Sequence, residues 1–176
     1  DDSFIKLIDN YQPDFIFFDK KRIKKLDSFF TSYSFESFEL LELKKKIKKK
    51  LNDNLALLIS TSGSTGTSKL VRLSADNLNE NINSIIHYLD ISQKDISITT
   101  LPMSYVYGLS IINTHLNQGA SIALNNKSVI EKEFWNKLQK SKVTNFGGVT
   151  YTYSILEKIK LKNFDLSSLK YTTQAG

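Results

Sequence analysis

A loop rich in hydroxyl groups occupies residues 60–69, which read STSGSTGTSK. Within ten residues it holds seven serines and threonines, two glycines and one lysine. Glycine lets successive backbone N–H groups converge on one point, hydroxyls add further donors, and Lys69 adds positive charge. Together these groups form a cage suited to the oxygens of a phosphate. The loop therefore predicts binding of a phosphorylated ligand.

Three familiar loops are excluded by the spacing of these residues. A Walker-type loop reads Gly-x-x-x-x-Gly-Lys-Ser/Thr, whereas Gly63 and Gly66 stand three apart and Lys69 follows three residues later. The dinucleotide fingerprint Gly-x-Gly-x-x-Gly is absent, and GSTG is one residue short of a nucleophile elbow. Taken alone, the composition fits a polar turn between two strands as well as it fits a phosphate site.

Strands and helices alternate around this loop. Apolar runs at Leu55–Ser60 and 70–73 predict strands on either side of it, and Ser74 is the predicted N-cap of the helix that follows. Ser128 with Glu131 predicts a capping box at the start of another helix. Further predicted strands are 14–19, 95–102, 120–125, 143–149 and 169–176. The predicted helices carry Leu78, Ile82, Ile85, Ile86 and Leu89; Leu109, Ile112 and Leu116; Ile130, Phe134 and Leu138; and residues 151–159.

This alternation predicts an α/β fold with a mainly parallel sheet and helices on both faces. Strands that alternate with helices are joined by right-handed crossovers, and ligands bind beyond the carboxyl ends of such strands. The loop at 60–69 follows the end of a predicted strand, so we expect it at the edge of the sheet where sites form.

The composition and charge of the chain exclude several kinds of site and partner. The chain has 176 residues, 40% of them hydrophobic, which allows the core of one ordinary domain. It has no cysteine, which excludes disulfides and cysteine metal sites. Much of the net charge of +6 comes from lysine-rich runs at 20–25 and 44–50, which hold a single arginine, Arg22, and none of the interleaved aromatic residues of nucleic-acid surfaces. With no membrane span and no signal peptide, we expect a cytoplasmic protein that binds no nucleic acid.

The motifs resemble those of a known family, the adenylate-forming (AMP-binding) enzymes, which include acyl-CoA synthetases and peptide-synthetase adenylation domains. STSGSTGTSK is similar to their phosphate-binding signature, and TTLPMSYVYGLS at 99–110 resembles their next motif. GASIALNN, VTNFGGVTYTYSIL and LKYTTQAG resemble later segments in the same order. The likeness covers residues 51–176 and implies part of the large N-terminal domain. Residues 1–50 are then the end of a preceding subdomain or a linker.

The resemblance implies roles for the residues that match each motif. Where this chain has Tyr105, many members carry a histidine, so the gate between the nucleotide and acid pockets would differ here. The implied residues are Thr61, Ser62, Gly63, Ser64, Thr65, Gly66, Thr67 and Lys69 for the ATP phosphates; Tyr105 and Tyr107 for the gate; Gly147, Gly148, Val149 and Thr150 for the acid pocket; and Gln174, Ala175 and Gly176 for the adenine side. No catalytic residue and no metal ligand is assigned, since the family's Tyr-Gly-x-Thr-Glu motif does not occur in the chain.

The implied activity is the ATP-dependent conversion of a carboxylic acid to an acyl-adenylate, followed by transfer of the acyl group to a thiol. The implied cofactors are ATP, Mg²⁺ carried in with the nucleotide, and coenzyme A or a phosphopantetheine thiol, with an acyl carrier protein as a further partner. The segment NFGGVTYTYS lacks the aspartate typical of amino-acid activators, which favours a fatty or other non-amino acid. The chain by itself is expected to be inactive.

Two other classes of function stay open on the sequence. One is an enzyme of phosphoryl transfer or nucleotide hydrolysis with an unusual loop. The other is a module that binds a phosphate or nucleotide without catalysis. Pyrophosphate exchange that depends on an added acid separates the first from an adenylate-forming enzyme, because a simple hydrolase shows none.

Overall fold

The computed structural model describes residues 2–21, 28–44, 50–60, 70–159, 161 and 164–175. The predicted phosphate-binding residues at 61–69 and the predicted adenine-side Gly176 lie outside the described residues. The chain forms two compact units, Asp1–Leu51 and Asn52–Gly176. The single core that we expected from the chain length is therefore wrong. The first unit forms around a small core of its own, built on one sheet and one helix.

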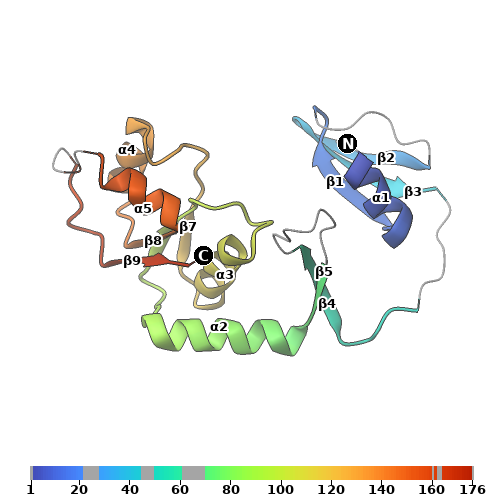
Figure 1. Cartoon of the computed structure of the whole chain (residues 1–176), viewed down its shortest axis with the longest axis horizontal. Coiled ribbons are helices and arrows are strands. Elements are labelled where there is room, and N and C mark those ends of the chain that lie inside the picture. The colour runs from blue at the N-terminus through green and yellow to red at the C-terminus, as the bar shows by residue number, and fades with distance from the viewer. Residues whose placement is uncertain are drawn as a thin grey trace. The chain divides into compact units, whose positions relative to one another are not determined.

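The first unit is a three-stranded antiparallel sheet with a helix packed on one face (Figure 1). Phe4 and Ile8 of the helix pack against the buried Ile16, Phe29 and Leu41 of the sheet. Its elements are α1 (Asp2–Tyr11), β1 (Phe15–Asp19), β2 (Phe29–Phe35) and β3 (Phe38–Leu43), and the strand order is β1-β3-β2. The strand predicted at 14–19 is confirmed as β1.

The opposite face of this sheet is aromatic and exposed. Side chains alternate between faces along a strand, so the neighbours of buried core residues point outward. Phe17 and Tyr33 are 65% and 60% exposed, and the rings of Phe17 and Phe38 stack with centroids 5.2 Å apart. Because apolar side chains occupy both faces, the sequence at 29–43 shows no period of two, and the hairpin of β2 and β3 was not predicted.

The second unit is an α/β fold around a four-stranded parallel sheet with the order β7-β6-β8-β9 (Figure 1). This confirms the predicted fold class. None of the helices in the described ranges is long and apolar enough to cross a membrane. The elements are β4 (Leu55–Ser60), β5 (Leu70–Ser74), α2 (Ala75–Leu89), β6 (Ile96–Ile98), α3 (Val106–Asn117), β7 (Ser121–Ala123), α4 (Lys132–Lys140), β8 (Asn145–Gly148), α5 (Thr150–Leu156) and β9 (Tyr171–Gln174).

Helices cover both faces of the parallel sheet, as predicted. Successive residues of β8 point to opposite faces. Phe146 packs edge to face against the rings of Phe134 and Trp135 on α4, and this cluster is the centre of the core. A side chain at the next residue, Gly147, would meet Ile111 of α3 on the other face.

The strand before the loop differs from its predicted place. We expected Leu55–Ser60 in the parallel sheet, but β4 pairs only with β5 among the described strands, as an antiparallel hairpin. The physical reason is the short connection, since a parallel crossover needs about a dozen residues or more and only 61–69 lie between the two strands. Ser60 pairs with Leu70, so the ends of the loop are held side by side.

Of the two predicted helix starts, the structure confirms one and contradicts the other. Ser74 is confirmed as the N-cap of α2, because its side chain accepts the N–H of Asn77 at 3.1 Å and the Asn77 side chain accepts the N–H of Ser74 at 3.1 Å. The capping box at Ser128 is wrong: the Glu131 carboxylate does accept the N–H of Ser128, but α4 begins only after Glu131. These contacts form a turn before the helix instead, and Ile130 is exposed.

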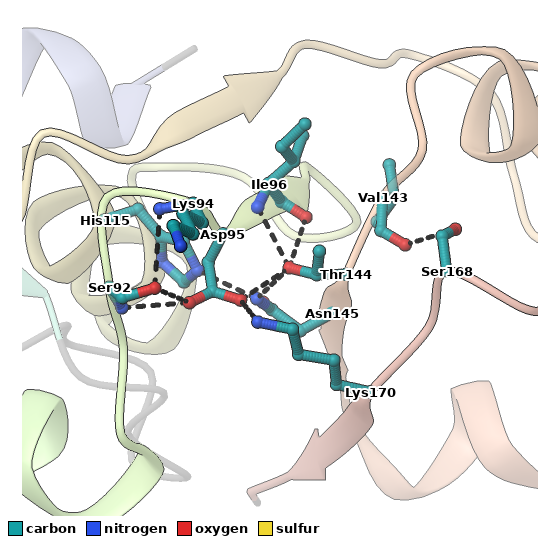
Figure 2. A network of polar contacts seen from close by, with 10 residues as sticks. All are labelled: Ser92, Lys94, Asp95, Ile96, His115, Val143, Thr144, Asn145, Ser168 and Lys170. Carbon is teal, nitrogen blue, oxygen red and sulfur yellow. Dashed lines mark hydrogen bonds and ion pairs between the residues drawn. The ribbon is translucent and has the colours of Figure 1, made fainter.

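A network of polar contacts ties together the amino ends of β6, β8 and β9 (Figure 2). Asp95, 1% exposed, accepts hydrogen bonds from Lys170 Nζ at 2.7 Å and Thr144 Oγ1 at 2.9 Å. Its other carboxylate oxygen accepts the N–H and the hydroxyl of Ser92, both at 2.9 Å. Burial by itself raises the pKa of this carboxyl, but the hydrogen bonds, led by that from Lys170, together outweigh it and lower the pKa to about 2.

A buried histidine joins α3 to β8 beside this network (Figure 2). His115 is 2% exposed, and its Nε2 lies 3.0 Å from the side-chain amide nitrogen of Asn145. Its Nδ1 lies 2.8 Å from the carbonyl oxygen of Ile111. Burial lowers the pKa of His115, so the ring is neutral at pH 7, with Nδ1–H as donor and Nε2 as acceptor. His115 is therefore a packed residue of the sheet–helix contact.

Candidate functional site

The predicted acid-pocket and adenine-side residues meet at the carboxyl ends of β8 and β9. The register of the two parallel strands pairs Gly147 with Thr173 and Gly148 with Gln174. The next residue after β9, Ala175, donates its N–H to the carbonyl of Gly148 at 3.4 Å. This is the edge at which ligands bind in parallel sheets.

Two tyrosines reach Thr173 from helices on opposite faces of the sheet. Tyr107 of α3 donates its hydroxyl to Thr173 Oγ1 at 2.6 Å. Tyr153 of α5 donates its hydroxyl to the carbonyl of Thr173, also at 2.6 Å. Burial raises the pKa of Tyr107 above its ordinary value, so its hydroxyl stays protonated and remains a donor at neutral pH. Both helices are thereby fixed to the end of β9.

The paired glycines of β8 lie where a side chain has no room. A Cβ at Gly147 would come within 2.6 Å of Ile111 Cδ1 and 2.8 Å of the Tyr107 hydroxyl oxygen. A Cβ at Gly148 would come within 2.9 Å of Thr152. Glycine therefore allows the two helices to approach the strand end closely, and it leaves the backbone of β8 as the wall of the site.

Polar side chains complete this edge. Thr100, in the segment after β6, donates its hydroxyl to the carbonyl of Gly147. The Gln174 side-chain amide donates to Thr150 Oγ1 at 3.3 Å, which joins the end of β9 to the start of α5. These contacts are all neutral. The arrangement suits a ligand that is held by shape and by hydrogen bonds rather than by a charged partner.

The segment before α3 packs tightly against its first turn. Tyr105 is the N-cap residue of α3, is 37% exposed, and donates its N–H to the carbonyl of Pro102 at 3.0 Å. Gly108 lies against the same segment, since a Cβ there would come within 2.3 Å of the Pro102 carbonyl oxygen and 3.0 Å of that of Leu101. Only a residue without a side chain fits at this contact.

Replacing Gly108 with alanine is expected to destabilise the second unit by about 3 kcal/mol, because the new methyl group meets backbone that cannot rotate away. Gly147→Ala should cost less, since its nearest neighbours are ends of side chains that can move. Urea denaturation followed by the fluorescence of Trp135, the only tryptophan of the chain, measures both. A larger loss for Gly147→Ala would contradict this reading of the two contacts.

A model of the AMP-binding enzyme family matches residues 9–176. The chain belongs to this family. The match includes most of the first unit as well as the whole of the second. The parallel sheet with its site edge is therefore part of an AMP-binding domain.

Solved structures with the same fold are adenylate-forming enzymes. One is o-succinylbenzoate CoA synthetase (MenE) from Bacillus subtilis in complex with the acyl-adenylate intermediate OSB-AMP, at 23% identity and a TM-score of 0.62. Others are the N-terminal domain of FACL13 from Mycobacterium tuberculosis, at 18% and 0.63, and ATP-bound MatB from Rhodopseudomonas palustris, at 22% and 0.61. These matches cover 70%, 74% and 77% of this chain but 32%, 33% and 27% of theirs, so the chain spans about a third or less of the proteins that it matches.

Within this AMP-binding domain, the structure gathers some predicted residues and not others. Tyr107, Gly147, Gly148, Thr150 and the pair Gln174 and Ala175 lie in one set of contacts. The half-buried Val149 is the N-cap residue of α5. Tyr105 lies at the start of α3. Its contact described above is with Pro102 and not with Gly147 or Gly148. That these residues form the acid pocket, the gate and the adenine side stays a prediction.

Three residues of this edge were missed by sequence reasoning. Thr100, Tyr153 and Thr173 all make hydrogen bonds to it. Thr173 could have been found, because it directly precedes Gln174 and the parallel register places it beside Gly147. No local sequence pattern indicated a role for Tyr153, since its partner Thr173 lies 20 residues away on another element.

No metal site is built into the described residues: none of the ranges given above contains a group of three or more His, Cys, Asp or Glu side chains placed to hold an ion. The donors at the site edge are hydroxyls, amides and backbone groups. They fit an organic ligand with polar groups, and they are not the carboxylate set that a bare divalent cation prefers.

Proposed function

We propose that the protein containing this chain activates a carboxylic acid with ATP. The carboxylate oxygen attacks the α-phosphorus, the bond to the bridging oxygen of the β-phosphate breaks, and pyrophosphate leaves, which yields an acyl-adenylate. The observation that carries this proposal is the match of the AMP-binding enzyme family over residues 9–176. The B. subtilis synthetase in complex with its acyl-adenylate and ATP-bound MatB support it.

In a second step, the acyl group passes to a thiol. The thiol loses its proton, its sulfur forms a bond to the acyl carbon, and the bond from that carbon to the phosphate oxygen breaks, so that AMP leaves. We propose coenzyme A or a carrier-bound phosphopantetheine as the thiol, and a fatty or other non-amino acid as the substrate. The name of the B. subtilis neighbour, a CoA synthetase, supports the choice of a thiol acceptor.

Two groups of residues would carry out these steps, the loop at 61–69 and the carboxyl ends of β8 and β9. The loop at 61–69 would hold the β- and γ-phosphates with N–H groups, hydroxyls and Lys69, which lowers the repulsion between two anions and aligns the leaving group. Mg²⁺ would enter with the nucleotide and supply further charge neutralisation. At the site edge, the acid would lie along the backbone of Gly147 and Gly148, and the adenine beside Gln174. The pairing of Gly147 with Thr173 and of Gly148 with Gln174 supports a pocket wall made of strand backbone.

The proposal is tested with the protein at its natural length. Exchange of labelled pyrophosphate into ATP should appear only when a suitable acid is added, because the exchange requires formation of the adenylate. A panel of fatty, aryl and amino acids identifies the substrate class. ATP turnover that no acid alters would refute the proposal and favour a hydrolase.

A further inference from the structure

The three-stranded sheet of the first unit has one face packed against α1 and another that carries exposed aromatic rings. Residues paired across strands share a face, and successive residues along a strand alternate between faces. The pair Ile16 and Leu41 is buried under α1, so the next pair, Phe17 and Leu40, lies on the other side. The register places six rings on this side, called the aromatic face here: Phe15, Phe17, Phe30, Tyr33, Phe35 and Phe38.

The aromatic face is large for a surface in contact with water. Its six rings are between 37% and 65% exposed. At roughly 200 Å² for each aromatic side chain, they present about 600 Å² of apolar surface. A patch of this size is at the upper limit of what monomeric proteins expose. With its flanking residues, the face approaches the roughly 800 Å² that each partner buries in a stable interface.

The middle of the face alternates large and small side chains. Phe17 of β1 and Tyr33 of β2 pair with the same residue of the central strand, Leu40. Leu40 is half-buried and shorter than the two rings beside it. Such a row interdigitates with an identical row turned against it, because the rings of one pack over the leucine of the other. The stacked rings of Phe17 and Phe38 are already ordered, which lowers the entropy lost on association.

The charges of the aromatic face argue against a membrane surface as its partner. Among the residues that strand pairing places on this face, the charged ones are Asp19 and Glu42. Both are carboxylates, which the anionic headgroups of a bilayer repel. Asp19 pairs with Phe38 and Glu42 pairs with Phe15, at opposite ends of the sheet. The carboxylates therefore lie at the rim of the face, where a protein interface keeps polar groups in water.

We propose that the aromatic face joins two copies of this protein, packed sheet against sheet. The same patch is used by both copies, so the contact has two-fold symmetry and closes as a dimer. Two sheets packed in this way lie about 10 Å apart and interdigitate their side chains. The size of the patch and its alternation around Leu40 favour a second copy over an unrelated partner. This inference does not depend on the proposed function.

The oligomeric state of the protein at its natural length tests the proposal. Sedimentation velocity over a range of concentrations should show a dimer in equilibrium with a monomer. Phe17→Ser combined with Tyr33→Ser should raise the dissociation constant about 100-fold, because each dimer loses four rings from the middle of its contact. Both residues are mostly exposed, so the far-UV circular dichroism should be unchanged. Tyr11→Ser, at an exposed ring on α1, is the matched control and should leave the dissociation constant unchanged.

A crosslinking test keeps all six rings in place. This chain has no cysteine, so one introduced thiol reports on one position. Leu40 lies at the centre of the face, and two-fold pairing brings the two copies of this position together. A short thiol–thiol crosslinker should join Leu40→Cys chains into covalent dimers. It should leave Tyr88→Cys, at an 85% exposed residue of α2, monomeric. Equal crosslinking of the two variants would contradict the proposed contact.

Other occupants of the aromatic face give different results. A protein of natural length that stays monomeric at every concentration would overturn the proposal, and so would a dimer that the double substitution does not weaken. Vesicles of phosphatidylcholine and phosphatidylglycerol that bind the wild type but not the double variant would assign the face to a membrane instead. None of these readouts involves pyrophosphate exchange, so a failure of the proposed function would leave them unchanged.

Discussion

Asp95→Asn lowers the free energy of unfolding of the second unit by about 3 kcal/mol at pH 7, as expected for loss of a buried, hydrogen-bonded carboxylate. The wild-type carboxylate accepts from Lys170 and Thr144 on one oxygen and from Ser92 on the other. An asparagine keeps one acceptor, but its NH₂ group meets a donor on the other side. Urea denaturation followed by Trp135 fluorescence measures the loss.

The pH dependence of this stability has a definite sign. The pKa of Asp95 falls from an ordinary 3.8 to about 2 in the fold, so its contribution is complete above pH 4 and is lost as the pH falls toward 2. A depression of this size corresponds to about 2 kcal/mol. Asp95→Asn should remove this part of the acid sensitivity, whereas Glu133→Gln, at an exposed position on α4, should not. A variant that keeps both the stability and the acid transition of the wild type would contradict the role of the network.

The loop lysine gives the largest expected effect on activity. In the protein at its natural length, Lys69→Ala should slow acid-dependent pyrophosphate exchange by about 100-fold to 1,000-fold, which is typical of removing one donor to a developing charge. The physical reason is the lost neutralisation of the leaving pyrophosphate.

Two controls make this result specific. Lys158→Ala removes an exposed lysine from the segment after α5 and should leave the exchange rate unchanged. The urea midpoint of Lys69→Ala should match the wild type, so that the lost activity is not a loss of fold. An exchange rate equal to that of the wild type would remove Lys69 from the phosphate site.

Local patterns predicted the architecture of the second unit well. The spacing of Leu78, Ile82 and Leu89 predicted α2, and Ser74 predicted its start, because both signals lie within a few residues of the contacts that they describe. The alternation of strands and helices predicted the parallel sheet for a similar reason, since crossover geometry follows from the order of elements.

Contacts between distant residues could not be predicted in the same way. Asp95 and Lys170 stand 75 residues apart, and Tyr107 and Thr173 stand 66 apart, so both pairs depend on the register of the sheet. The hairpin of β2 and β3 was missed because aromatic residues occupy both of its faces. The clash that makes Gly108 necessary is likewise visible only when Pro102 is placed in space.

At the candidate site, too, the motifs predicted some residues and only the structure revealed others. The family resemblance named Gly147, Gly148 and Gln174, which the structure brings to one edge through strand pairing. It did not name Thr173, which Tyr107 and Tyr153 both contact. For the loop at 61–69, the assignment to phosphate stays a prediction based on residue types and on its short, antiparallel anchorage between Ser60 and Leu70.

The central claim is that ATP lies between this loop and the carboxyl ends of β8 and β9. A crystal structure of the protein at its natural length with a non-hydrolysable ATP analogue tests it most directly. We predict phosphate density against the backbone and hydroxyls of residues 60–69 and adenine density beside Gln174 and Ala175. Phosphates bound at any other part of the protein would contradict the account.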